Sequence, residues 1–231
     1  MGTFQEHKSI SVIIPTLDAA EVLPSTLSAL AAAYLVREIV IADGGSRDDT
    51  AAIAEAAGAR VIVAERGRGP QLAAGAAAAS SEWLLFLHAD CRLSPSWEAD
   101  AAAFLAAPNA TARAGYFVFA LDDPSPAARR LERIVAWRCR LLGMPYGDQG
   151  LLIARSLYEA VGGFAALPLM EDVDLVRRIG RHRLMLLPAP IVSSARRYRS
   201  GGYVRRPLRN LLCLSLYFAG VPLRRIVRLY G

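Results

Sequence analysis

Three aspartates stand at the ends of short apolar runs in the first half of the chain. Asp18, Asp43 and Asp90 each end or follow such a run, and His88 precedes the last of them by two residues. Carboxylate oxygens hold Mg²⁺ or Mn²⁺ alongside substrate phosphates, and an imidazole can ligate the same ion or donate to a phosphate. One such aspartate alone is equally typical of a turn, so it is the repetition that predicts a shared polar site.

The residues after Asp43 suit a site that a ligand approaches closely. Gly44 and Gly45 leave the backbone open, and the Asp43 carboxylate could accept a hydrogen bond from a nucleobase N–H. The alternative is a turn-forming role for Asp43. Ser46 and Asp49 match a capping box, which predicts a helix start and explains Asp49 without a function.

The segment Arg66-Gly-Arg-Gly69-Pro-Gln71 combines two guanidinium groups with glycines just ahead of an expected helix. Backbone N–H groups at a helix N-terminus bind anions, and so do arginine side chains, so the segment indicates a phosphate site. An ordinary strand-to-helix turn explains the same residues equally well.

Three carboxylates stand close together at Glu171, Asp172 and Asp174, ahead of an apolar helical face. Asp172 suits the N-cap position and Asp174 the first turn, where negative charge meets the helix dipole. The functional alternative is that one carboxylate takes a proton from an attacking hydroxyl as a general base.

Strands and helices must alternate in the first half, and this order would bring the aspartates together. Apolar runs predict strands at 10–15, 38–43, 60–64 and 83–88, with helices at about 20–33, 48–57 and 71–79. Such a series forms a mostly parallel sheet covered by helices on both sides. Ligands of these sheets bind beyond the carboxyl ends of the strands, where the three aspartates stand.

The second half of the chain is less regular. Its pattern predicts strands at 112–121, 150–154 and 184–187, helices at 126–142 and 172–181, and then a loop rich in proline and arginine. An apolar and basic helical segment at 207–231 ends the chain.

The composition fits one domain over residues 1–231. Of these residues 54% are hydrophobic, and the net charge of +6 is almost entirely arginine, because Lys8 is the only lysine. Arginine suits phosphate ligands, acidic membranes and nucleic acid about equally well, and a solvated basic surface is the simpler alternative. Three scattered cysteines favour neither a disulfide framework nor a zinc site, and no signal peptide or spanning helix is expected. We therefore expect a cytoplasmic protein, with membrane association open.

Taken in order, the motifs resemble the family 2 inverting glycosyltransferases with the GT-A fold, a three-layer α/β sandwich with a mostly parallel, mixed central sheet. The resemblance covers about residues 9–200 and rests on Pro15-Thr-Leu-Asp18, Asp43-Gly-Gly-Ser46, Arg66-Gly-Arg-Gly69, His88-Ala-Asp90 and Glu171-Asp172. Two further motifs look like a subgroup of small bacterial members found with selenium- or arsenosugar-related operons: Tyr146-Gly-Asp148-Gln149-Gly150 and Arg196-Arg197-Tyr198.

The resemblance implies that a nucleoside diphosphate sugar binds at the carboxyl edge of the sheet. The residues it assigns to this donor are Pro15, Thr16, Asp18, Asp43, Arg66, Gly69, Gln71, His88, Ala89, Asp90, Asp148, Gln149, Arg196 and Arg197. It places Mn²⁺ or Mg²⁺ at Asp90 and His88, and because His88 stands where the family has an acid, dependence on the metal stays open. It makes Asp172 the general base, with Glu171 beside it orienting or binding the acceptor.

Transfer with inversion makes two physical demands. The leaving diphosphate needs its charge stabilised, and the acceptor hydroxyl has to lose a proton on the opposite face of the sugar. In the resemblance, metal at Asp90 meets the first demand and Asp172 the second. The expected loop carries three arginines that would either fold over the diphosphate or remain solvated: Arg196, Arg197 and Arg199.

The C-terminal segment has an apolar centre flanked by arginines, and Pro222 should kink or divide it. Packing on the core or in a homodimer ranks first for this segment, and contact with the inner face of a membrane second. Two other functions stay open: another nucleotide-sugar enzyme such as a nucleotidyltransferase, and a non-catalytic arginine-rich protein that binds polyanions or membranes. We expect no nucleic acid partner, and the sequence does not identify the acceptor.

Overall fold

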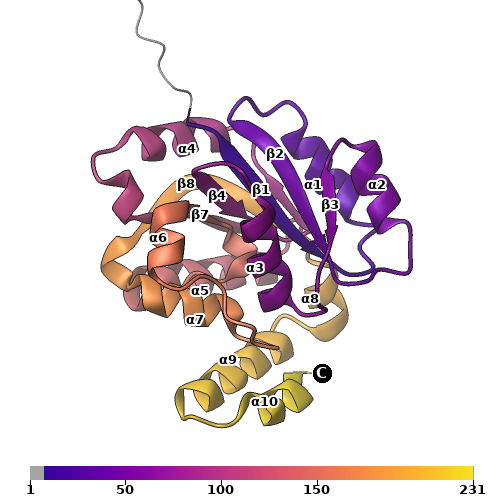
Figure 1. Ribbon diagram of the computed structural model, residues 1–231. Helices are drawn as coiled ribbons and strands as arrows, with labels where there is room; N and C mark the ends of the chain where they lie inside the picture. Colours follow the sequence, from indigo (N-terminus) through magenta and orange to yellow (C-terminus); the bar gives the residue numbers. More distant parts are fainter. Residues whose placement is uncertain (1–7, 231) are drawn as a thin grey trace, which may run out of the picture.

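The apolar runs of the first half form parallel strands. The computed structural model describes residues 8–230, and the expectation of no signal peptide at residues 1–7 lies outside them. The strands lie in the order β3-β2-β1-β4. They and the helices between them are β1 (Ile10–Thr16), α1 (Leu23–Leu30), β2 (Val36–Asp43), α2 (Thr50–Ala56), β3 (Arg60–Val63), α3 (Arg68–Ala78) and β4 (Trp83–Phe86). The predicted alternation of strands and helices is confirmed (Figure 1).

The remaining strands extend the same sheet in mixed directions. They are β5 (Cys91–Leu93), β6 (Ala114–Leu121), β7 (Leu151–Ala154) and β8 (Leu184–Ser193), and the full order is β3-β2-β1-β4-β7-β6-β8-β5. Strand β7 is antiparallel to β4 and β6, whereas β6 and β8 are parallel. The sheet is therefore mixed and mostly parallel, as predicted.

Strand β8 is longer than the predicted strand at 184–187. It continues through Pro188 and Pro190 to Ser193, and its pairing with β6 shifts register between Phe117 and Val118. Proline cannot donate a ladder hydrogen bond, so an irregularity of this kind is what allows it inside a strand.

Further helices and short 3₁₀ turns cover the sheet and continue the chain. They are α4 (Trp97–Ala106), η1 (Ala110–Ala112), α5 (Pro126–Leu142), η2 (Gly147–Gln149), α6 (Arg155–Ala160), α7 (Glu171–Ile179), η3 (Arg181–Arg183), α8 (Arg196–Gly201), α9 (Arg205–Phe218) and α10 (Leu223–Tyr230). Helix α5 has its predicted bounds. The predicted loop after β8 instead contains helix α8, with Ala195 as its N-cap residue.

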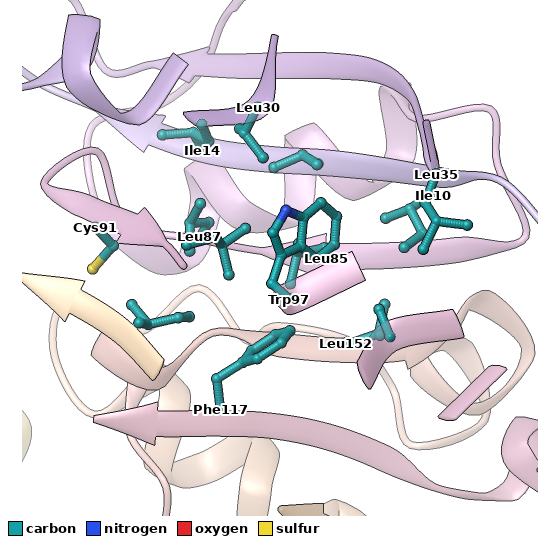
Figure 2. Packing of buried hydrophobic residues seen from close by; sticks show 14 of the residues in the cluster. Ile10, Ile14, Leu30, Leu35, Leu85, Leu87, Cys91, Trp97, Phe117 and Leu152 are labelled. Atoms are coloured by element: carbon teal, nitrogen blue, oxygen red, sulfur yellow. The ribbon is translucent and has the colours of Figure 1, made fainter. Parts of the chain in front are cut away.

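Alternation along β1 assigns its side chains to the two faces of the sheet. Ile10 and Ile14 belong to the cluster that includes α1 and α4, whereas Ile13 packs with α3, α6 and α7. Figure 2 shows Ile10 and Ile14 in the first cluster with Trp97 of α4 and Leu152 of β7. A one-residue slip would exchange the faces of all these side chains, so burial on both sides fixes the register that positions the strand ends.

Two local predictions were wrong. Ser46 and Asp49 do not form a capping box, because Asp49 is itself the N-cap residue, without a side-chain capping bond, and the Ser46 hydroxyl donates to Asp43. Asp172 is not the N-cap residue of α7 but its second residue. Met170 precedes the helix in the left-handed conformation, with φ 65°.

The C-terminal segment consists of two helices. Helix α9 ends at Phe218, and α10 begins directly after Pro222, which divides the segment as expected. Figure 1 shows the pair side by side at one end of the molecule. Their inner sides pack on α7 in a cluster that includes Val173, Cys213 and Ile226. Among residues 8–230, no helix combines the length and the apolar character that a membrane span requires.

Candidate active site

A cleft of about 610 Å³ opens beyond the carboxyl ends of β1 and β4. Strand β1 lies between β2 and β4, and the chain crosses from one side of β1 to the other, so this is the switch point at which such sheets bind ligands. We call it the strand-edge cleft. Ten of the predicted donor residues line it: Pro15, Thr16, Asp18, Arg66, Gln71, His88, Ala89, Asp90, Arg196 and Arg197.

Asp43 ends β2 and does not line the strand-edge cleft. Its carboxylate accepts hydrogen bonds from the hydroxyls of Thr16 and Ser46 and from the backbone N–H groups of Gly45 and Ser46. Burial would raise the pKa of Asp43, but these hydrogen bonds outweigh burial and hold the pKa below its usual value. Asp43 thus makes the contacts of a turn-forming residue, and its role toward a nucleotide stays a prediction.

Gln71 serves mainly to hold neighbouring backbone. Its buried side-chain amide donates to the carbonyl oxygens of Thr16 (2.6 Å) and Ala42 (2.7 Å), tying β1 to β2 at the edge of the cleft. Gly69 faces away, toward residues 165–167. A Cβ there would lie 2.3 Å from the carbonyl oxygen of Ala165, so only glycine fits.

Gln149 is also buried, at 2% exposure, and lies outside the cleft. Its amide donates to the carbonyl oxygen of Phe117 (3.1 Å) and accepts from Arg138 (3.2 Å). Gln149 therefore anchors the turn η2 to β6, and it is Asp148 within this turn that faces a cavity.

The start of α3 points into the strand-edge cleft. Gly67 is the N-cap residue and offers no side-chain cap, while Arg66 and Arg68 stand on either side of it. Uncapped backbone N–H groups and the positive end of the helix dipole favour an anion at this position. The geometry therefore supports the predicted anion site over an ordinary turn.

Arg68 connects His88 to Glu171. Its Nη1 lies 3.3 Å from His88 Nε2, and its Nε lies 3.3 Å from a Glu171 carboxylate oxygen. Burial, together with the charges of Arg68 and Arg197, lowers the pKa of His88 to about 3, so its imidazole is neutral. Guanidinium can only donate, so Nε2 accepts and the ring proton is assigned to Nδ1.

Glu171 is enclosed more completely than any other carboxylate near the cleft. Only 2% of its surface is exposed. Burial, together with the negative charge of neighbouring Asp172, raises the pKa of Glu171 to about 7, although Arg68 acts in the opposite direction. Glu171 thus faces Arg68 rather than open solvent.

A second cavity, of about 120 Å³, contains Asp172. Its lining is continuous with that of the strand-edge cleft through the residues they share: Arg68, His88, Asp90, Ser194 and Arg197. We call it the Asp172 cavity. Its other walls come from η2, from α8 and from the C-terminal helices, and include Tyr146, Asp148, Tyr198, Asn210 and Tyr230.

The turn η2 holds the Asp172 carboxylate in place. The backbone N–H of Gly147 donates to Asp172 Oδ2 at 2.8 Å, and the N–H of Val173 donates to Oδ1 at 2.7 Å. A Cβ at Gly147 would lie 2.5 Å from His88 Nε2, so the close approach of the turn to the imidazole and the Asp172 carboxylate requires glycine. The carboxylate keeps lone pairs for a proton donor in the cavity.

Two buried oxygen atoms on the walls of the Asp172 cavity have no hydrogen-bond partner among the described residues. They are Asp148 Oδ1 and Asn210 Oδ1. Burial raises the pKa of Asp148 to about 6, with Arg138 acting against it and Asp172 adding to it. Buried acceptors without partners are rare, so these atoms indicate that a cation or a hydroxyl-bearing ligand belongs there.

The residues near Asp90 suit a divalent cation. His88, Asp90 and Cys91 each offer a donor atom, and these atoms lie within 4.8 Å of one another. Burial raises the pKa of the Cys91 thiol well above its usual value, so the thiol stays protonated and is a poor ligand. Asp90 and Asp148 supply the hard oxygen donors that Mg²⁺ and Mn²⁺ prefer, and Asp148 Oδ1 has no hydrogen-bond partner within residues 8–230.

The three arginines of the expected lid separate in the structure. Arg196 lines the strand-edge cleft and pairs with Glu21 across it, and Arg197 lines both cavities. Arg199 instead pairs with Asp122 and Asp123, lines neither cavity and stays 54% exposed, which agrees with the solvated alternative.

Sequence reasoning missed the residues that the C-terminal helices contribute. Asn210 and Tyr230 line the Asp172 cavity although they are remote in sequence from every recognised motif. The only available signal was that these two polar side chains stand among apolar and basic ones. Nothing in the sequence placed them beside Asp172.

The fold agrees with that of known GT-A glycosyltransferases. Glucosyl-3-phosphoglycerate synthase from Mycobacterium tuberculosis, solved with Mn²⁺, UDP and glucosyl-3-phosphoglycerate, superposes with a TM-score of 0.65 at 20% identity, over 93% of this chain and 81% of that one. TarS 1-349 from S. aureus gives 0.61 at 16% identity, over 96% and 69%. At these identities the likeness establishes the fold alone.

Sequence similarity identifies the family. The model of Glycosyl transferase family 2 matches residues 11–167, so the chain belongs to that family and the predicted class of enzyme is confirmed. A PGL/p-HBAD biosynthesis glycosyltransferase of Mycobacterium tuberculosis is 40% identical over 105 residues. That match spans 42% of this chain and 40% of the relative, well under two thirds of its length. An uncharacterized glycosyltransferase of the same species is 39% identical over 83 residues, which is 36% of this chain and 37% of the relative.

Proposed function

We propose that residues 1–231 form one catalytic unit that transfers a sugar from a nucleoside diphosphate sugar to an acceptor hydroxyl with inversion. One observation carries the proposal. In a family 2 chain, the strand-edge cleft of arginines and an uncapped helix start opens directly into the cavity that holds Asp172. A diphosphate leaving group and a general base can therefore stand on opposite sides of one sugar.

The strand-edge cleft supports the donor assignment by its charge and shape. Arg66 and Arg68 stand at the N-terminus of α3, where the diphosphate would lie, and Arg197 lines the same cleft. Thr16 and Asp18 at the end of β1 are left for the nucleoside. Asp43, in this proposal, acts through Thr16, whose hydroxyl it holds at 2.9 Å.

A divalent cation would be held by Asp90, with His88 and Asp148 as further candidates. Bound there, it would neutralise charge on the leaving diphosphate. Arg68 already donates to His88 Nε2, so its guanidinium lies next to this position. This positive charge would also help to neutralise the leaving diphosphate. Because this hydrogen bond occupies His88 Nε2, Asp90 is the stronger candidate ligand and His88 the weaker one.

Asp172 is the proposed general base. Two backbone N–H groups, one of them from η2, hold its carboxylate in place. The carboxylate faces a cavity large enough for a hydroxyl group. A base within hydrogen-bond reach of the attacking hydroxyl contributes about 10²–10⁴-fold to the rate. Glu171 would act through Arg68, fixing the guanidinium that faces the diphosphate.

The known structures suggest which donor to test first. The synthase that shares the fold was solved with Mn²⁺, UDP-glucose and phosphoglyceric acid. UDP and UDP-glucose are therefore the first donors to try on this chain, and the acceptor class remains a separate question.

Isothermal titration calorimetry with UDP, GDP, CDP and dTDP, each with and without Mn²⁺, tests the proposal. We expect at least one nucleotide to bind, and Asp90→Ala to weaken the metal-dependent part of that binding. Glu98→Ala, an acid outside both cavities, serves as the matched control. If none of the nucleotides binds, either with or without Mn²⁺, the proposal loses its support.

A further inference from the structure

Charge is distributed unevenly along the chain. Residues 1–174 hold all 21 acidic side chains and 14 basic ones, whereas residues 175–231 hold thirteen arginines and no acidic residue. Three of these arginines are neutralised by acids of the earlier part, since Arg178, Arg196 and Arg199 form ion pairs there. The remaining charge is concentrated toward the C-terminal helices.

Helix α9 is apolar on two sides. Its inner side, with Cys213 and Leu214, is buried in the cluster on α7. On its outer side Leu208, Leu211 and Leu212 are 59%, 57% and 52% exposed. Their spacing of three and four residues puts them on one stripe of the helix. A row of exposed leucines along one helix marks an interaction surface rather than an ordinary solvated face.

Exposed arginines accompany this stripe. Arg205 begins α9, and Arg224, Arg225 and Arg228 lie on α10, which packs beside it. None of the four forms an ion pair within residues 8–230. We call the outer leucines of α9 together with these four arginines the basic leucine face. Figure 1 shows the two helices at one end of the molecule, away from the sheet.

We propose that the basic leucine face docks on the surface of an anionic lipid bilayer. The leucines would enter the boundary between headgroups and acyl chains, and the guanidinium groups would meet lipid phosphates. Helix α9 has 14 residues, which is too short to span a bilayer and suits a helix that lies in its plane. A bilayer supplies both the apolar and the negatively charged contacts that this face needs.

A second copy of the chain fits this face less well. A two-fold dimer places the same patch of each subunit against the other. The basic leucine face would then meet its own arginines, with no acidic residue of the C-terminal part to offset them. Like charges brought together in this way oppose association.

Docking would also orient the active site. The inner sides of the same two helices contribute Asn210 and Tyr230 to the Asp172 cavity. The basic leucine face would therefore hold that cavity close to the bilayer, where an acceptor hydroxyl carried on a lipid could reach Asp172. This last step rests on the proposed function, whereas docking itself does not.

Vesicle flotation of the full chain tests docking without nucleotide or acceptor, so its failure is distinguishable from failure of the proposed function. Two vesicle types are compared at low salt: phosphatidylcholine alone, and phosphatidylcholine with about one third phosphatidylglycerol. We expect flotation with the anionic vesicles, at least about tenfold less with the neutral ones, and loss of flotation in high salt.

Matched variants locate the contact. Leu208→Gln/Leu212→Gln and Arg224→Glu/Arg225→Glu should each reduce flotation about tenfold or more. The controls are Leu186→Gln on β8 and Arg37→Glu on β2, which change exposed residues elsewhere and should float like the parent. Circular dichroism checks that every variant is folded.

Two outcomes would overturn the proposal. One is that the parent floats with neither vesicle type, or that both double variants float as well as the parent. The other is a dimer in sedimentation experiments that the leucine variant dissociates, because the face would then be a contact between copies.

Discussion

The strand-edge cleft and the Asp172 cavity share five wall residues but are built in different ways. The cleft is formed at the ends of β1 and β4 and at the start of α3, elements of the regular parallel half. The Asp172 cavity is formed by the turn η2, helices α7 and α8 and the two C-terminal helices. The first is set by sheet topology, and the second by packing between segments that are distant in sequence.

This difference suggests that the two sites have different functions. A site at the switch point of a sheet is available to every protein with the topology, so the strand-edge cleft suits the donor that such enzymes have in common. The walls of the Asp172 cavity depend on individual side chains such as Asn210 and Tyr230. These walls are where selectivity for a particular acceptor would arise.

Replacing Asp172 should separate the two sites most sharply. We expect Asp172→Asn to lower the transfer rate by about 10²–10⁴-fold, because an amide cannot take the proton of the acceptor hydroxyl. Nucleotide affinity should stay within about twofold of the parent, since the amide keeps the size of the side chain and Asp172 does not line the strand-edge cleft. Single-turnover assays and calorimetry measure the two quantities.

Asp174→Asn is the matched control for this prediction. Asp174 stands in the same first turn of α7, but its carboxylate pairs with Arg178. If Asp174→Asn transfers sugar at nearly the parent rate and Asp172→Asn does not, the assignment of Asp172 as the general base is supported. A large loss of nucleotide affinity in Asp172→Asn would contradict the division between the two sites.

Arg68 lies in both sites, so its removal should affect both. We expect Arg68→Met to weaken nucleoside diphosphate binding about 10- to 100-fold, because it removes the positive charge proposed to face the diphosphate. In the parent, contacts with His88 and the buried Glu171 hold this guanidinium in place. Arg60→Met, at the start of β3 and far from the cleft, is the control. Unchanged affinity in Arg68→Met, measured by calorimetry, would show that the diphosphate lies elsewhere.

The sequence predicted the strand-edge cleft more completely than the Asp172 cavity. β-branched runs and the alternation of strands with helices determine the parallel order, and this order brings Asp18 and Asp90 to one edge. Asp43 was expected at the same edge and is there. Its carboxylate, however, already accepts hydrogen bonds from the backbone N–H groups of the turn that follows it. Whether a polar side chain faces a ligand or the neighbouring backbone is decided by hydrogen bonds that spacing does not reveal.

The Asp172 cavity depends on contacts that no local pattern encodes. Gln149 and Asp148 are adjacent in sequence, yet the first is buried against Phe117 and the second lines the cavity. The predicted loop after β8 is helix α8, and Arg199 turned toward Asp122 and Asp123. Such choices are settled by tertiary packing, which is why the sequence predicted Asp148 and Asp172 but neither Asn210 nor Tyr230.

The acidity of Glu171 offers a test of stability at the boundary between the two sites. Its pKa rises from 4.5 to about 7, mainly through burial. A carboxyl whose folded pKa is raised stabilises the fold below its unfolded pKa and loses that contribution as pH rises through the folded value. We therefore expect Glu171→Gln to gain stability relative to the parent, by about 1–3 kcal/mol, between pH 5 and pH 8.

Urea unfolding at several pH values measures this difference. Glu159→Gln, an exposed acid on α6, should show no such trend. A constant difference between Glu171→Gln and the parent from pH 5 to pH 8 would mean that Glu171 stays ionised throughout. Its link to Arg68 would then be an ordinary ion pair at every pH.

The smallest effect is expected at the open rim of the strand-edge cleft. Glu21 pairs there with Arg196, and both side chains are largely exposed. Exposed ion pairs are weak, so Glu21→Gln should leave stability unchanged but free Arg196 to face a diphosphate. We expect nucleoside diphosphate affinity to rise by at most about threefold at low salt and to match the parent at high salt. Glu55→Gln on α2, away from the cleft, is the control and should leave this affinity unchanged. A fall in affinity in Glu21→Gln would show that Glu21 itself contacts the donor.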